Sequence, residues 1–191
     1  MTNRRIEAST RGQQHGFIRR MVSPGDPISE RIKPFVFLDF INGPVADGAG
    51  FGWHPHSGIA TLTYALDADM AYEDTAGQQG LVKATGLEWM RAGGGIWHQG
   101  RIHPHGPTVT SFQLWLALPP ELENGPDQGI KVAPEAVPQL GNVRMLLGRY
   151  GESSNPIPAP SPVLYLDGVL AEGESWTFQP PLGHSVAWVF A

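Results

Sequence analysis

The chain has 191 residues, of which 24 are glycine and 18 are proline, and 41% are hydrophobic. Both glycine and proline are nearly twice as frequent as in average proteins. Because they interrupt regular elements, this composition excludes a helical bundle or a long coiled coil, whereas the hydrophobic share is large enough for a packed core. The formal net charge of −5 has the wrong sign for general nucleic-acid binding.

Short runs of β-branched, aromatic and aliphatic residues, each closed by glycine or proline, predict a series of short strands. In chain order these runs are 15–22, 35–41, 58–66, 68–74, 81–83, 87–90 and 109–118. A loop rich in glycine and proline is expected over 42–52. Neither a clear amphipathic helix nor a repeat of solenoid length is visible. Regularly spaced short strands with turn signals are typical of a β-sandwich or barrel, so we expect an all-β fold.

The composition changes after the last of these runs. Residues 119–138 contain five prolines, which favours a connection between domains with at most one helical turn. Strand character resumes in four further runs, which are 143–150, 163–169, 175–178 and 185–190. We therefore expect a first domain over 1–120, a linker over 121–138 and a smaller second domain over 139–191.

Several classes of protein are excluded by what the chain lacks. There is no cysteine, which excludes disulfides, cysteine-based zinc sites and thiol nucleophiles, so that any metal must be held by His, Asp or Glu. The first twelve residues lack the apolar core of a signal peptide, and no apolar run approaches the ~18 residues of a membrane span. We expect a cytoplasmic protein with neither a membrane nor a nucleic acid as partner. The phosphate-binding, dinucleotide-binding, nucleophile-elbow and HExxH motifs are also absent.

The histidines are the strongest chemical signal. His54 and His56 are two residues apart, and in a strand this spacing places both imidazoles on one face. The expectation is that the pair opens a strand. A triple-glycine turn at 93–95 then brings His98 into the same region. Three neutral imidazoles suit a divalent transition metal, although a bare His-x-His pair also occurs at strand ends by chance.

The segments FLDFINGP, GWHPHSGIATLTYAL, WMRAGGGIWH and SFQLWLALP occur in this order within 16–120. Together they resemble the pirin family of the cupin superfamily. The resemblance implies a bicupin, in which two antiparallel jelly-roll barrels (double-stranded β-helices) stack and the N-terminal barrel holds a metal. It also implies the activities ascribed to the family, which are ring cleavage of flavonols of the quercetin 2,3-dioxygenase type and regulatory binding to other proteins.

Carried over residue by residue, the family's three histidine ligands fall on His54, His56 and His98. Its glutamate ligand falls on Gly100, which has no side chain, and a second pocket glutamate falls on Ala60. The resemblance therefore implies a neutral three-histidine site for a divalent metal, with Fe(II) the first choice and Zn, Cu or Ni as alternatives. Such a site leaves coordination positions open, but it lacks the base expected to deprotonate a flavonol.

Further candidates surround these positions. His103 and His105 form a second His-Pro-His, which supplies either a substitute ligand or an exposed loop. Four large side chains form either an aromatic mouth for a planar substrate or ordinary core. They are Phe51, Trp53, Met90 and Trp97. Asp39 and Glu88 are the carboxylates that could approach the site.

Three functions follow from these observations. The first is a metal-dependent dioxygenase acting on a small aromatic substrate, and the second is a non-catalytic pirin-like module that binds a protein partner. The third is a structural remnant with neither role. The range 139–191 is short for a second barrel, so we expect an incomplete C-terminal cupin in a short or truncated member of the family. Its exposed edges should pack on the first barrel or on a second copy in a homodimer.

Overall fold

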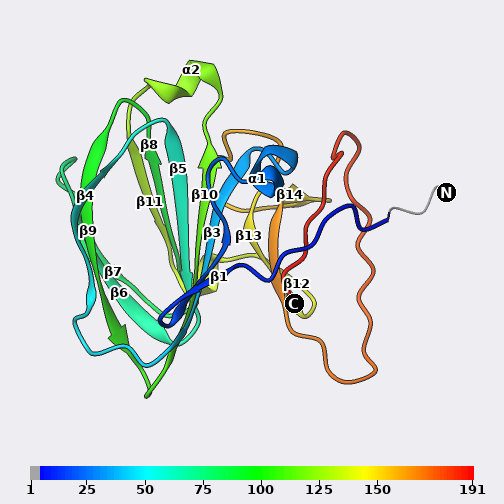
Figure 1. The fold of residues 1–191 in the computed structure, drawn as a ribbon, viewed down its shortest axis with the longest axis horizontal. Coiled ribbons are helices and arrows are strands. Elements are labelled where there is room, and N and C mark those ends of the chain that lie inside the picture. The colour runs from blue at the N-terminus through cyan, green and yellow to red at the C-terminus, as the bar shows by residue number, and fades with distance from the viewer. Residues whose placement is uncertain (1–4) are drawn as a thin grey trace.

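The computed structural model describes residues 5–191, and its regular elements are almost all β-strands (Figure 1), which confirms the all-β class. Residues 1–4 of the predicted first domain lie outside the described residues. The strands are β1 (Gln13–His15), β2 (Ile18–Val22), β3 (Phe35–Gly43), β4 (Gly50–His56), β5 (Ile59–Ala65), β6 (Ala68–Asp74), β7 (Gln79–Val82), β8 (Leu87–Ala92), β9 (Ile96–Pro104), β10 (Val109–Ala117), β11 (Gln128–Val132), β12 (Gln139–Leu140), β13 (Val143–Leu147), β14 (Arg149–Tyr150), β15 (Ser153–Ser154) and β16 (Tyr165–Gly168). The helices are α1 (Pro27–Arg31), α2 (Pro120–Glu123) and the 3₁₀ turn Pro134–Ala136.

Two antiparallel sheets face each other in the N-terminal part (Figure 1). The large sheet has the strand order β1-β2-β3-β10-β5-β8-β11, and the small sheet has the order β4-β9-β6-β7. Contacts between their inner faces include the rings of His56 and Trp115, whose centroids are 5.0 Å apart. The space between the two sheets is therefore the interior of the first barrel.

The largest apolar core lies outside this barrel. Because side chains alternate along a strand, residues such as Leu38, Leu62 and Leu114 share the outer face of the large sheet. This face packs against Leu146 and Leu147 from the C-terminal part, in one continuous cluster. Tyr64 adds a polar link, since its hydroxyl donates a hydrogen bond of 2.9 Å to Asp167. The opposite, inner face of the sheet is much more polar.

The range 121–138, predicted to be a linker, contributes a strand to the first barrel. The expected helical turn is present as α2, but β11 then pairs with β8 along its whole length, from Gln128↔Arg91 to Val132↔Leu87. A short strand whose flanks are rich in proline carries little periodicity of its own, so its pairing is decided by the neighbouring edge. This part of the predicted linker is therefore a strand of the large sheet.

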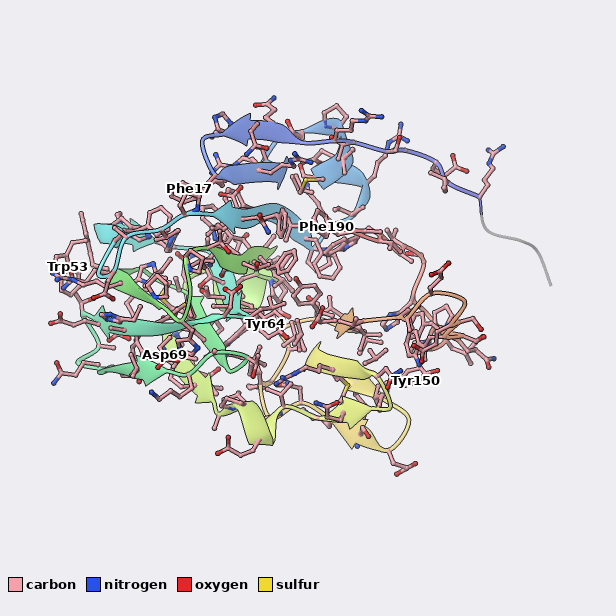
Figure 2. All side chains as sticks on the ribbon, turned by 90° about the horizontal axis from the view of Figure 1, so that it is seen from below. Phe17, Trp53, Tyr64, Asp69, Tyr150 and Phe190 are labelled. Carbon is pink, nitrogen blue, oxygen red and sulfur yellow. The ribbon has the colours of Figure 1, made fainter. Side chains whose placement is uncertain are left out.

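The C-terminal part contains the sheet β12-β13-β16 and the pair β14-β15. The predicted strand over 163–169 is present in shortened form as β16, but 175–178 and 185–190 form no strand, because no neighbouring strand pairs with them. The last segment packs on the first barrel instead. Trp188 lies edge-on to Phe35, with ring centroids 5.5 Å apart, and Phe190, labelled in Figure 2, lies 4.9 Å from Phe40.

No helix within residues 5–191 combines the length and the apolar character needed to cross a membrane.

Candidate metal centre

The structure brings His54, His56 and His98 together on the inner face of the small sheet. His54 and His56 lie at the end of β4, so the His-Pro-His closes a strand rather than opening one. His98 lies on β9 directly opposite His54, in the antiparallel register His54↔His98. The strand begins at Gly50, within the predicted loop, because Gly50 and Phe51 also pair with β9, although the register shifts between Phe51 and His54.

The three imidazoles are close enough to share one ion. One ligand nitrogen from each ring lies within 4.8 Å of the others. The ring centroids are 4.3 Å apart for His54 and His98, 4.9 Å for His54 and His56, and 5.1 Å for His56 and His98. Within residues 5–191, no other group of three potential ligands converges in this way.

The surroundings keep these rings in the form that binds metals. Burial, with a smaller contribution from His54, lowers the pKa of His56 to about 4. Burial, followed by the neighbouring imidazoles and Lys131, lowers the pKa of His98 to about 3. The Nδ1 of His54 lies 2.7 Å from the carbonyl oxygen of Gly52, which can only accept, so in the neutral ring Nδ1 carries the proton and Nε2 is the nitrogen with a lone pair.

The Nε2 of His98 is buried and has no hydrogen-bond partner. A buried polar atom without a partner is costly unless something else satisfies it. A divalent transition metal fits the donor set, because neutral imidazoles on a rigid sheet are ligands that such ions accept. The orphaned nitrogen and the converging rings therefore make this cluster a candidate metal centre.

Gly100, the position of the family glutamate, also faces the barrel interior. It lies two residues beyond His98 on β9 and opposite Tyr72 of β6. A Cβ atom added at Gly100 would meet only the carbonyl oxygen of Ala71, at 3.5 Å, which is ordinary contact. The cluster thus lacks a carboxylate at this position, although the backbone leaves room for a Cβ atom.

A row of polar side chains crosses the inner face of the large sheet opposite the imidazoles. Its members are successive partners in the strand register, and they come from six adjacent strands. In order from β2 to β11 they are Arg20, Asp39, Gln113, Thr63, Glu88 and Lys131. We call this set the polar row. It was not recognised in the sequence, because cross-strand register cannot be read from one chain segment at a time.

Hydrogen bonds link most of the polar row. Arg20 donates two bonds of 2.9 Å to the carboxylate of Asp39, which is a bidentate pair. Thr63 lies 3.2 Å from a carboxylate oxygen of Glu88 and 3.1 Å from the side-chain oxygen of Gln113. Of the two carboxylates that the sequence offered, Asp39 is engaged by Arg20 and Glu88 faces Lys131.

Lys131 reaches across the barrel from β11 to the small sheet. Its Nζ lies 3.7 Å from a carboxylate oxygen of Glu88 and 3.9 Å from the ring centroid of Tyr72. Burial lowers the pKa of Lys131, and the negative charges of Glu88 and Asp74 oppose that change. The only signal in the sequence is a single charge between Ile130 and Val132, in a range interpreted as linker.

Of the aromatic residues beside the imidazoles, Phe51 was predicted, whereas Trp115 and Phe37 were not. Trp115 lies 5.0 Å from His56, and Phe37 stacks on Trp115 with centroids 4.0 Å apart. Phe51 approaches His54 edge-on at 6.2 Å. Sequence reasoning missed Trp115 and Phe37 because both belong to strands that were interpreted only as apolar core.

The other predicted pocket residues have different surroundings. Trp53 is 45% exposed and lies at the margin of the molecule (Figure 2). Trp97 is 50% exposed, and its side chain lies on the face of β9 opposite to that of His98, because neighbouring residues of a strand alternate between faces. Trp97 does border the shallow hollow beside His56 and the glycine turn. Met90 is buried and belongs to a small apolar cluster with Ala92 and Ile96. No closed aromatic mouth is built from these four residues.

His103 and His105 lie away from the imidazoles. His103 is five residues beyond His98 on β9, which corresponds to about 16 Å along a strand. Its Nδ1 lies 2.7 Å from Asp47, and the Nε2 of His105 lies 3.0 Å from Asp69. The second His-Pro-His therefore supplies no substitute ligand in this conformation.

The family model described as Pirin matches residues 17–116, which are 100 of the 191 residues. A curated protein of Pseudomonas aeruginosa, "Putative quercetin 2,3-dioxygenase PA2418", is 28% identical over 91% of this chain and 66% of its own length. A "Pirin-like protein" of Caulobacter vibrioides is 32% identical over 74% of this chain and 54% of its own length. The chain thus spans about half to two thirds of these curated relatives.

Solved structures agree with this assignment. A quercetin 2,3-dioxygenase from Acinetobacter baumannii is similar with a TM-score of 0.71 and 25% identity, over 80% of this chain and 58% of that one. The bacterial pirin YhhW from Escherichia coli, in complex with nickel(II), shares the fold with a TM-score of 0.56 and 20% identity, over 71% of this chain and 58% of that one. The expected cupin architecture is confirmed, and by its family model and its fold the chain belongs to the pirin family.

Proposed function

We propose that His54, His56 and His98 hold a divalent transition metal and that the chain carries out dioxygenase chemistry of the quercetin 2,3-dioxygenase type. The observation that carries the proposal is the convergence of three neutral imidazoles, with ligand nitrogens within 4.8 Å, inside a barrel. The names of the similar proteins from Pseudomonas and Acinetobacter support the reaction class.

Iron(II) is the proposed ion, with nickel, zinc and copper accepted by the same donors. When bound, iron(II) supplies the electron transfer between dioxygen and substrate that spin rules otherwise make slow. The chain's own residues bind and orient the substrate. Trp115, backed by the stacked ring of Phe37, offers a flat wall beside His56 against which an aromatic ring can pack.

The experiment is metal analysis after anaerobic loading with Fe(II), followed by aerobic assays with quercetin and with β-diketones. We expect about one metal ion per chain, lost in His98→Ala and retained in His103→Ala, whose ring pairs with Asp47. Consumption of dioxygen with a ring-cleaved product supports the reaction class. Failure of the loaded protein to retain any metal contradicts the proposal.

A second candidate is a non-catalytic module that binds another protein. It is favoured by the exposure of Trp53 and Trp97 on the outer side of the small sheet, since exposed tryptophans are enriched at protein interfaces. A stoichiometric partner that is retained by His54→Ala and released by Trp97→Ala would favour this candidate over catalysis. The cytoplasm as compartment and a homodimer as assembly stay predictions.

A further inference from the structure

Lys131 differs from the other lysines of the chain. The side chains of Lys33 and Lys83 are 55% and 64% exposed, whereas that of Lys131 is 18% exposed. Its ammonium is largely buried in the barrel interior. Burial of a charged group is costly unless other groups replace the solvation that water provided. The position of this charge therefore calls for an explanation.

The ammonium lies against Tyr72, the cross-strand partner of Gly100, and Gly100 is the position at which the resemblance implies a glutamate. Gly100 and Tyr72 are direct partners across β9 and β6, and the Nζ of Lys131 lies 3.9 Å from the centre of the Tyr72 ring. His98 is two residues from Gly100 on the same face of the strand. Next to the strand pair that carries His98, the chain thus has an ammonium, and it has a glycine where the resemblance implies a glutamate.

Glu88, the ion-pair partner of Lys131, does not occupy all the hydrogen-bond donors of the ammonium. The distance of 3.7 Å to Glu88 is longer than the 2.7–2.9 Å of a strong charge-assisted hydrogen bond. An ammonium has three donors, so donors remain for a ligand that enters the barrel. Both side chains are partly reachable by solvent, with 18% and 14% of their surface exposed.

We propose that Lys131 is a specificity-determining residue that binds the negatively charged oxygen of the substrate while the metal binds a second oxygen. The substrate class is a small carboxylate or acidic enol that is already ionised in solution, so that no protein carboxylate is needed to remove its proton. This inference rests on the proposed function, because it requires a metal on the three imidazoles.

The test uses protein loaded with cobalt(II), whose visible spectrum reports ligands that enter the coordination sphere. Azide serves as the anionic probe and imidazole as a neutral one. Lys131→Met should weaken azide binding by about tenfold or more and leave imidazole binding within about twofold, because only the anion gains from the ammonium. Lys83→Met, which removes an exposed lysine on the outer face, should change neither.

Glu88→Gln provides the change of opposite sign. Removing the negative partner should tighten azide binding severalfold, since the ammonium then acts without compensation. Because Lys131→Met leaves a buried carboxylate unpaired and can unfold the chain, the double variant Lys131→Met/Glu88→Gln is compared with Glu88→Gln alone. Azide affinity should again fall about tenfold between these two proteins.

The outcomes separate the two hypotheses. Cobalt that fails to bind to the unaltered protein overturns the proposed function together with this inference. Cobalt that binds normally, with equal azide affinity in the unaltered protein and in Lys131→Met, overturns the inference alone and leaves Lys131 with a purely structural ion pair. Equal weakening of azide and imidazole would also overturn it, because the loss would then concern the metal site and not the charge.

Discussion

Gly100 leaves the imidazole cluster without a negatively charged ligand, although the backbone there could carry one. A Cβ atom would meet only the carbonyl oxygen of Ala71, at 3.5 Å. The side chain of a glutamate would then extend on the face that His98 occupies. What the cluster lacks at this position is therefore a side chain, because the backbone has space for a Cβ atom.

Gly100→Glu should raise the affinity for a divalent metal by about tenfold or more, because a carboxylate adds a charged ligand to three neutral ones. Competition against a chelating dye measures the change. Gly100→Gln is the matched control, since it adds a side chain of the same size without the charge. A gain of the same size in Gly100→Gln would show that charge is not the cause.

The imidazoles also make stability depend on pH. The pKa of His56 falls from its usual 6.5 to about 4, and that of His98 to about 3. Above pH 6.5 both rings are neutral in the folded and the unfolded chain, so they cause no pH dependence there. As the pH falls below 6.5, the unfolded chain binds protons that the folded chain excludes, and the free energy of unfolding decreases until both states are protonated below about pH 3.

Denaturant titrations of metal-free protein between pH 7.5 and 5 should show this loss. Each ring contributes at most about 1.4 kcal/mol per pH unit, and less here because solvent reaches both rings. His98→Gln should reduce the slope, since one of the two titrating groups is gone. A free energy of unfolding that stays constant or rises towards pH 5 would contradict the assignment of these groups.

The sequence identified the imidazoles but not their surroundings. His54, His56 and His98 are recognisable because their spacing within two motifs is local. Lys131 and Trp115 were not placed in the site, because each lies opposite the imidazoles only through the facing of two sheets. Which side chains meet across a barrel depends on cross-strand register, and register is set by contacts between distant segments.

Among the elements, β4 and β9 carry the three histidines, and their backbones approach each other closely at Gly50. At Gly50, opposite Arg101, an added Cβ atom would collide with the carbonyl oxygen of Gly100 and would lie 2.9 Å from the Cα of Arg101. Gly52, two residues further along β4, has open space at the same atom. The two glycines therefore differ in structural role although they share one strand.

Gly50→Ala should lower the free energy of unfolding by about 1–3 kcal/mol and weaken metal binding, because the methyl group pushes the two strands apart. Gly52→Ala should change stability by less than about 0.5 kcal/mol. Urea titrations and metal competition on both variants measure this. Equal effects of the two substitutions would mean that the pairing of β4 with β9 tolerates the added methyl.

The remaining errors in the predicted elements have a common cause. The predicted strand over 15–22 is a hairpin of β1 and β2, because Gly16 adopts a left-handed conformation with φ of 60° and turns the chain. The proline-rich surroundings of β11 hid a real strand, whereas 185–190 has strand-like alternation without a strand partner. Local patterns reveal which segments can be strands, but the available edges decide which ones are.

At the scale of the whole molecule, the C-terminal segment completes the outer surface of the first barrel. Trp188 contacts Phe35 and Tyr165, with ring centroids 5.5 and 5.9 Å away, and Phe190 packs on Phe40 and Phe112. These contacts are the packing on the first barrel that was one of the two expected ways to cover the exposed edges. These contacts belong to one chain and do not require a second copy.

Trp188→Ala should lower the free energy of unfolding by about 1–3 kcal/mol and expose the C-terminal segment to proteases. Val189→Ala, next to it and 88% exposed, should have almost no effect. The loss should be the same at protein concentrations that differ tenfold, because the contacts lie within one chain. A loss that depends on concentration would instead support packing between copies in a homodimer.

The two faces of the large sheet have different roles, one in stability and the other in the candidate site. The face turned towards Leu146 and Leu147 carries the apolar core, whereas the face turned towards the imidazoles carries the polar row. Stability and chemistry therefore depend on alternate residues of the same strands. Residues on the inner face can therefore be substituted to bind another ligand while the apolar core on the outer face continues to stabilise the fold.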